Sequence, residues 1–193
     1  MNKIDPNKPL PQIHQREIVA KSGFFRVERV DLEFSNGATR QFERMAGSGR
    51  GAVMIVPFID DETFLLIREY AAGTHSYQIG FPKGLIDPGE TALEAADREL
   101  KEEAGYGANS LKDIHTVSMA PTFFDAKMNI VLAKDLYPCQ LEGDEPEPLE
   151  VIKWSVHDID ELLARPDFVE ARCIAALFLV QKHLTTNSQS EQN

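Results

Sequence analysis

The stretch from Gly84 to Tyr106, GLIDPGETALEAADRELKEEAGY, constrains the fold more than any other part of the chain. Its proline-glycine pair predicts a tight turn, and a helix with recognisable ends follows the turn. Thr91 and Glu94 match a capping box, so we expect this helix to begin near Ala92. Gly105 is typical of the residue that ends a helix.

The two faces of this helix differ in chemistry. One face is apolar and should pack against a sheet. Its residues recur at spacings of three and four: Leu93, Ala96, Leu100 and Ala104. On the other face, Glu99, Glu102 and Glu103 crowd one patch at i, i+3 and i+4. Like charges at this spacing destabilise a helix by about 0.2–0.5 kcal/mol per pair, which favours a bound cation. Carboxylate oxygens suit magnesium, and a solvated acidic helix is the alternative interpretation.

The spacing of the polar and glycine residues resembles the signature of the Nudix family, G-x5-E-x7-R-E-U-x-E-E-x-G-U, in which U is aliphatic. The matching residues are Gly84, Glu90, Arg98, Glu99, Leu100, Glu102, Glu103 and Gly105. Tyr106 departs from the pattern at the last aliphatic position, which concerns packing rather than chemistry. A match over so many spaced positions is far more specific than a lone glycine motif. The chain is therefore identified as a member of the Nudix family.

The patterns around this signature predict an α/β protein. Alternating apolar residues and an Asn36-Gly37 hairpin signal indicate three antiparallel strands near the amino terminus. Core strands are expected at AVMIVPFI, TFLLIREY, SYQIGF, HTVSMA, KMNIVLAKDL and VIKWSV. A short helix over 158–164 and a longer one ending near Leu184 should follow. These elements predict a three-layer α/β/α sandwich around a mixed β-sheet, plus an N-terminal antiparallel sheet, and the Nudix resemblance implies the same fold.

We expect four segments along the chain. Residues 1–16 are proline-rich and are expected to form a flexible leader. Residues 17–47 should form the N-terminal antiparallel strands, which the family resemblance associates with dimerisation. Residues 48–185 are the expected Nudix hydrolase domain, and the polar residues 186–193 are an expected disordered tail.

Composition narrows the classes of partner. The net charge of -11 argues against nucleic acid, because binding its backbone needs clustered lysine and arginine. The apolar runs are too short to span a bilayer, and the amino terminus has no apolar signal segment, so we predict a cytoplasmic protein without a membrane partner. Cys139 and Cys173 fit neither a zinc site nor a disulfide framework. A small anionic substrate that binds together with a divalent metal is compatible with this charge.

A metal held by carboxylates beside a glycine-containing turn suits hydrolysis of a phosphoanhydride. The Nudix resemblance implies four metal ligands: Glu99, Glu102, Glu103 and the main-chain carbonyl of Lys83. It also makes Glu102 and Glu103 catalytic candidates, and it implies that Arg98 holds the signature together by pairing with Glu90. The expected cofactor is magnesium (Mg²⁺), with manganese (Mn²⁺) as the alternative.

The general base varies within the Nudix family and often lies in an acidic loop before a late strand. In this chain the acidic loop is GDEPEPLEV, which carries Glu145 and Glu147. Both occupy the position that ADP-ribose-hydrolysing members use, if VIKW is aligned with the strand that follows their loop. We prefer Glu147 as the base, with Glu145 as the second candidate. A solvated loop whose prolines prevent pairing as an edge strand is the other interpretation.

Substrate choice depends on residues outside the signature. Pro121, in SMAPT, resembles the mark of ADP-ribose pyrophosphatases, and most of the chain is similar to bacterial Nudix hydrolases of ADP-linked compounds. The resemblance implies a homodimer that hydrolyses ADP-ribose, diadenosine triphosphate and NADH and releases AMP. Arg44, in FERM, and Arg68, in LIREY, are the substrate-binding candidates. For either arginine, a solvated or ion-paired role is the alternative.

Two other functions remain as alternatives. An RNA 5′-pyrophosphohydrolase would share the signature, but the acidic balance and the lack of a basic stripe disfavour it. A non-catalytic Nudix module that senses ADP-ribose usually has eroded signature glutamates and an appended DNA-binding domain, and this sequence shows neither.

Overall fold

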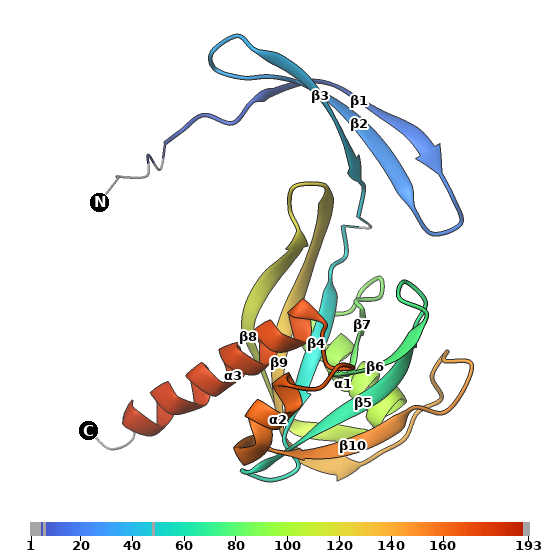
Figure 1. Cartoon of the computed structure of the whole chain (residues 1–193), viewed down its shortest axis with the longest axis vertical. Helices are drawn as coiled ribbons and strands as arrows, with labels where there is room; N and C mark the ends of the chain where they lie inside the picture. The colour runs from blue at the N-terminus through green and yellow to red at the C-terminus, as the bar shows by residue number, and fades with distance from the viewer. Residues whose placement is uncertain (1–4, 6, 48, 191–193) are drawn as a thin grey trace. The chain divides into compact units, whose positions relative to one another are not determined.

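The computed structural model describes residues 5, 7–47 and 49–190, which fall into two compact units (Figure 1). The N-terminal unit comprises Met1–Gly49 together with Ser118–Ala126. The second unit comprises Arg50–Val117 and Lys127–Asn193.

The N-terminal unit is built from three antiparallel strands. They are β1 (Gln12–Lys21), β2 (Arg26–Glu33) and β3 (Thr39–Met45). Strand β2 lies between the other two, and the turn to β3 contains Gly37 with a φ of 78°, as the asparagine-glycine pair predicted. Met45, at the end of β3, pairs with Phe124. The predicted N-terminal antiparallel sheet is therefore confirmed.

Strand β1 begins inside the segment that we expected to be a flexible leader. That expectation is wrong for residues 12–16, because they belong to a strand that pairs with β2, with a register shift between Ile13 and Gln15. Gln12 lies opposite Glu33, and the His14 imidazole Nε2 is 2.9 Å from Glu33 Oε2. The prolines come before the strand and do not interrupt it, since the last of them is Pro11. Residues 1–4 and 6 of the expected leader lie outside the described residues.

The second unit is organised around a mixed sheet. Its strands are β4 (Ala52–Pro57), β7 (Lys83–Leu85) and the parts outside Ser118–Ala126 of β8 (Tyr106–Ala120) and β9 (Phe124–Pro138). Strand β4 pairs with β9 in parallel and with β7 in antiparallel orientation, and β8 pairs with β9. Every residue of β4 is buried, as expected for a strand that is covered on both faces.

Three strands of the second unit form a separate antiparallel sheet, where the sequence analysis expected one mixed sheet. Their order is β10 (Glu150–Ser155), β5 (Thr63–Ala71) and β6 (Ser76–Gly80). In this arrangement Glu150 lies opposite Arg68, and Tyr70 lies opposite Tyr77.

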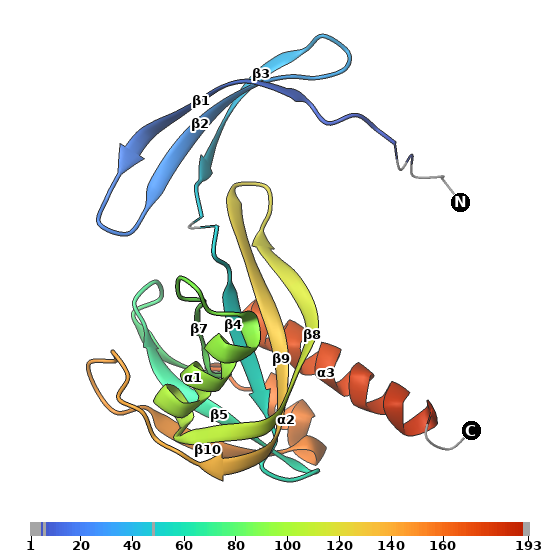
Figure 2. The ribbon, with the colours of Figure 1, turned by 180° about the vertical axis from the view of Figure 1, so that it is seen from behind.

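Helices α1 (Ala92–Ala104) and α3 (Ala171–Ser190) cover opposite faces of the mixed sheet, as the two views show (Figures 1 and 2). Alternation along β4 explains this arrangement. Val53 and Ile55 pack with α1, whereas Met54 and Val56 pack with α3. Two shorter helices, η1 (Val156–Asp158) and α2 (Ile159–Leu163), come between β10 and α3. The predicted α/β/α sandwich is confirmed.

Helix α3 continues to Ser190, whereas the sequence analysis expected it to end near Leu184. Residues 185–190 include no proline or glycine, and the hydroxyls of Thr185 and Thr186 donate to carbonyls one turn earlier, at 2.9 and 3.0 Å. Residues 186–190 of the expected disordered tail are therefore helical, and 191–193 lie outside the described residues. Within the described part of the chain, no helix has both the length and the hydropathy needed to cross a membrane.

Candidate active site

Helix α1 is held in register at both ends. At the start, the Glu94 N–H donates to Thr91 Oγ1 (3.3 Å), and the Thr91 N–H donates to Glu94 Oε2 (2.7 Å). This reciprocal pair is the predicted capping box. At the other end, Gly105 adopts the left-handed conformation with a φ of 75°, and its N–H donates to the Leu100 carbonyl. The two caps fix where the acidic residues of this helix project.

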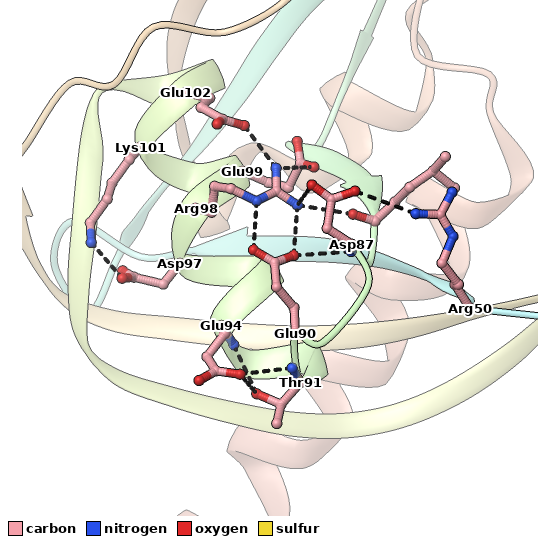
Figure 3. Close-up of polar contacts among 11 residues, drawn as sticks. Arg50, Asp87, Glu90, Thr91, Glu94, Asp97, Arg98, Glu99, Lys101 and Glu102 are labelled. Carbon is pink, nitrogen blue, oxygen red and sulfur yellow. Dashed lines mark hydrogen bonds and ion pairs between the residues drawn. The ribbon is translucent and has the colours of Figure 1, made fainter.

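The Arg98 guanidinium connects the carboxylates of this region (Figure 3). Its Nε and Nη2 donate to the two carboxylate oxygens of Glu90, at 2.8 and 3.0 Å, as the family resemblance implied. Its Nη1 donates to Glu99 Oε1 (2.7 Å) and Glu102 Oε2 (2.9 Å). A further bond from Nη2 to the Leu85 carbonyl (3.0 Å) ties the group to β7. Arg98 therefore orients two of the predicted ligands.

Glu99 and Glu103 are the buried charged residues of the described chain, with exposed fractions of 9% and 6%. The Lys83 backbone N–H donates to Glu103 Oε2 (2.7 Å). Burial raises the pKa of Glu103 to about 8, although the charge and the N–H of Lys83 act in the opposite direction. Burial also raises the pKa of Glu99, against the influence of Arg98. Each carboxylate is thus costly to ionise without a further positive charge nearby.

Glycine is required at Gly84 by the position of Glu99. A Cβ atom at Gly84 would lie 2.0 Å from Glu99 Oε1 and 2.1 Å from the carboxylate carbon. Because the obstructing group is the end of a flexible side chain, a substitution would displace the carboxylate without unfolding the protein. The spacing of the signature therefore places Glu99 directly against β7.

Gly84→Ala should reduce turnover by about 10²-fold while leaving the melting temperature nearly unchanged, since a displacement of about 1 Å in a catalytic group can have an effect of this size. Steady-state rates and thermal denaturation measure the two effects separately. Gly73→Ala is the matched control, because nothing lies within 4 Å of a Cβ atom built there. Wild-type turnover in Gly84→Ala would contradict the placement of Glu99.

The chemistry of these residues fits a divalent cation. The predicted metal ligands all coordinate through oxygen, the ligand atom that magnesium prefers. Three of these ligands are carboxylates, so the site carries an excess of negative charge. Glu102 and Glu145 add to the raised pKa of Glu99, and Glu99 adds to that of Glu103. Among the described residues, no three histidine, cysteine, aspartate or glutamate side chains converge in a ready-made metal cage. In this arrangement the Glu99 and Glu102 carboxylates are turned toward Arg98.

The two candidate bases of the acidic loop lie in different surroundings. Glu145 is half-buried, and its charge raises the pKa of Glu99. A Cβ atom at Gly143 would lie 2.2 Å from Glu145 Oε2 and 3.6 Å from the Glu102 Cβ, so Glu145 is close to the signature helix. Glu147 instead accepts a hydrogen bond from the Tyr77 hydroxyl (2.5 Å) on β6. This arrangement favours Glu145, although the sequence analysis preferred Glu147.

Both substrate-binding candidates are engaged in ion pairs. Arg44 belongs to the N-terminal unit, where its Nε donates to Glu28 Oε2 (2.7 Å). Arg68 lies on β5, with its Nη1 3.4 Å from Glu150 Oε2 and its guanidinium carbon 5.0 Å from the centroid of the Tyr77 ring. A substrate role for either arginine stays a prediction.

Sequence reasoning missed two contacts near the carboxylates. The Lys83 ammonium pairs with the Glu69 carboxylate on β5. Burial alone would lower the pKa of Lys83, but the charges and the hydrogen bond of Glu69 and Glu103 outweigh it and leave this pKa raised. The second missed contact is the bond between Tyr77 and Glu147. Neither contact could be predicted from a local sequence pattern, because each joins strands or loops that are far apart in the sequence.

Comparison with known proteins gives two family matches along the chain. Residues 11–44 match the NudE-type Nudix hydrolase N-terminal domain, and residues 49–178 match the NUDIX domain. The second match contains all the residues of the signature. The boundary between the two matches lies close to the end of β3.

Individual relatives agree with these matches. The chain is 59% identical over 174 residues to the ADP compounds hydrolase NudE of Escherichia coli, an alignment that covers 90% of this chain and 93% of the relative. It is 26% identical to an ADP-ribose pyrophosphatase of Bacillus subtilis, covering 86% and 93% of the two chains. A crystal structure of an ADP compounds hydrolase superposes with a TM-score of 0.89 at 56% identity, covering 95% of this chain and 98% of the other.

Proposed function

This chain belongs to the Nudix hydrolase family, and we propose that it is a cytoplasmic enzyme that hydrolyses the pyrophosphate bond of ADP-linked compounds. The proposed substrates are ADP-ribose, diadenosine triphosphate and NADH, and AMP is a product from each. The observation that carries the proposal is the pair of buried carboxylates, Glu99 and Glu103, held beside β7 in the Nudix signature. The similarity to the ADP compounds hydrolase NudE supports this class of substrate.

Four groups of this chain would hold the metal: the carboxylates of Glu99, Glu102 and Glu103 and the main-chain carbonyl of Lys83. When bound, a divalent ion supplies positive charge to the bridging phosphates and lowers the pKa of a water molecule. Magnesium is the proposed ion and manganese the alternative. Arg98 orients Glu99 and Glu102, and the Lys83 N–H orients Glu103. Burial keeps bulk water away from Glu99 and Glu103, which strengthens the electrostatic effect of these two carboxylates.

We assign the general base to Glu145. Its carboxylate takes the proton of the attacking water while the new oxygen-phosphorus bond forms and the bridging phosphorus-oxygen bond breaks. From ADP-ribose the products are AMP and ribose 5-phosphate. The assignment is supported by the influence of Glu145 on the pKa of Glu99 and by its position beside Gly143 and Glu102.

The signature glutamates and the net charge of the chain weigh against the two alternative functions. All the signature glutamates are present, which favours an enzyme over an ADP-ribose sensor. The net charge of -11 disfavours an RNA substrate, which would gain from a basic surface.

Incubation with magnesium and each of four compounds tests the proposal: ADP-ribose, NADH, diadenosine triphosphate and triphosphorylated RNA. We expect AMP from the first three. Cleavage of the RNA alone would establish the RNA pyrophosphohydrolase instead. Binding of ADP-ribose without hydrolysis would identify a sensor.

We further propose that the protein is a homodimer formed through its N-terminal strands. Every residue of β1 is exposed, and Ile18, Phe25 and Phe42 have exposed fractions of 49%, 50% and 46%. A three-stranded sheet with so little buried surface is marginal unless another surface covers it. Light scattering in solution should give twice the chain mass. A monomer at micromolar concentration would contradict the proposal, and Phe42→Ser should shift a dimer toward monomer.

A further inference from the structure

The acidic segment 142–149 is attached to the second unit at both of its ends. At its start, the Leu141 N–H donates to the Lys101 carbonyl (3.2 Å), and Gln140 Nε2 donates to the Glu102 carbonyl (2.9 Å). Both carbonyls belong to the last turn of α1. At its end, the segment enters β10, where Glu150 pairs with Arg68 of β5. The segment therefore connects the signature helix with the β5–β6 hairpin.

Between these ends the segment has little hydrogen bonding of its own. It forms neither helix nor strand, and Pro146 and Pro148 have no N–H to donate. In the described part of the chain, the bond from the Tyr77 hydroxyl to Glu147 Oε1 (2.5 Å) is the single hydrogen bond between this segment and the rest of the protein. Leu149 adds an apolar contact with the core beneath α1.

Tyr77 is well placed to hold the segment, because two neighbouring side chains contact its ring. Its strand neighbour Tyr70 lies directly opposite, with ring centroids 5.8 Å apart in an edge arrangement. The Arg68 guanidinium lies over the Tyr77 ring at 5.0 Å and also pairs with Glu150. The Tyr70 hydroxyl is engaged elsewhere, 2.6 Å from His75 Nδ1. Only one of the two tyrosine hydroxyls therefore reaches the acidic segment.

We propose that Tyr77 is a positioning residue, whose hydroxyl bond to Glu147 fastens the acidic segment so that Glu145 is held beside the signature carboxylates. Two residues span at most about 7 Å, and each glutamate precedes a proline that restricts its backbone. Fixing Glu147 therefore limits where Glu145 can lie. Glu147 is an anchor in this arrangement, not the general base. The catalytic part of the proposal rests on the proposed function, whereas the fastening does not.

Limited proteolysis with a glutamate-specific protease tests the fastening without any substrate. The bond after Glu142 is exposed, and cleavage there requires the segment to open. Tyr77→Phe should accelerate this cleavage about tenfold. The matched control is Tyr70→Phe, which removes a hydroxyl from the opposite residue of the same sheet and should leave the rate unchanged. An unchanged rate in Tyr77→Phe, or an equal increase in both variants, would overturn the proposal.

Kinetics then test the positioning. Tyr77→Phe and Glu147→Ala should each lower kcat about tenfold with KM nearly unchanged, and the double variant should be no worse than either. Glu147→Gln keeps an acceptor oxygen, so its kcat should lie closer to that of the wild type than the kcat of Glu147→Ala. If Glu147 were the general base, Glu147→Ala and Glu147→Gln would lower kcat equally, because neither side chain can accept the proton. Three results would overturn the positioning role. They are equal inactivation by Glu147→Ala and Glu147→Gln, additive losses of kcat in the double variant, and faster proteolysis of Tyr77→Phe with an unchanged kcat.

The two arms separate this proposal from the proposed function. If the wild-type protein hydrolyses no ADP-linked compound, the proposed function fails, and the proteolysis result still decides whether Tyr77 fastens the segment. If the wild type is active and Tyr77→Phe is indistinguishable from it in both arms, the proposal fails and the proposed function stands.

Discussion

Glu103→Gln should lower kcat for ADP-ribose hydrolysis by about 10³-fold or more, because it removes the charge of a proposed metal ligand from the proposed catalytic site. Glu103 is 6% exposed, so water cannot replace the missing carboxylate oxygen. The measurement is the initial rate of AMP release at saturating magnesium. Glu161→Gln is the control, since it makes the same change of charge at an exposed position on α2.

The stability of Glu103→Gln should show that the variant folds, so that its lower kcat reflects the lost carboxylate and not unfolding. A glutamine carbonyl can still accept the hydrogen bond from the Lys83 N–H. The pKa of Glu103 rises from 4.5 to about 8 in the folded protein, so over this range the folded state binds a proton that the unfolded chain has lost. The contribution of Glu103 to the stability of the metal-free wild type should therefore fall as the pH rises from about 4.5 to 8.

Glutamine does not titrate, so that contribution disappears in Glu103→Gln. In the presence of a chelator, the variant should melt no lower than the wild type at pH 7 and higher at pH 9. A variant that is unfolded at pH 7 would contradict the account of Glu103.

Glu145→Gln should lower kcat by about 10²–10⁴-fold while KM changes little, the effect expected from removing a general base. Glu145 is the residue of the acidic segment whose charge reaches Glu99. Asp144→Asn is the control, because it removes one negative charge from the exposed neighbouring residue. Steady-state kinetics with ADP-ribose distinguish the two. Near-normal turnover in Glu145→Gln, with strong loss in Glu102→Gln or Glu147→Gln, would show that the base is elsewhere.

The signature helix could be predicted in detail because its determinants are local. Thr91 and Glu94 cap it from three residues apart, and Gly105 ends it with a backbone conformation that favours glycine. The pairing of Arg98 with Glu90 also joins residues that are close in sequence. Spacing alone therefore located the helix and its acidic face.

Features that depend on distant contacts could not be predicted in this way. Strand β1 extends into the expected leader because β2 offers it a partner. The contact that favours Glu145 over Glu147 as the proposed base comes from Tyr77, which lies 70 residues before Glu147 in the sequence. The pairing of Lys83 with Glu69 likewise crosses from β7 to β5. Sequence patterns report periodicity and caps, but they do not report which loop lies against which strand.

Calorimetric titration of magnesium into the metal-free protein tests the central claim most directly, because it requires neither substrate nor turnover. If the buried carboxylates of α1 form the metal site, the wild type should give saturable heat, and Glu99→Gln and Glu103→Gln should each abolish or strongly reduce it. Glu161→Gln should bind as the wild type does. Wild-type protein that gives no saturable heat, or glutamine variants that bind magnesium normally, would contradict the account.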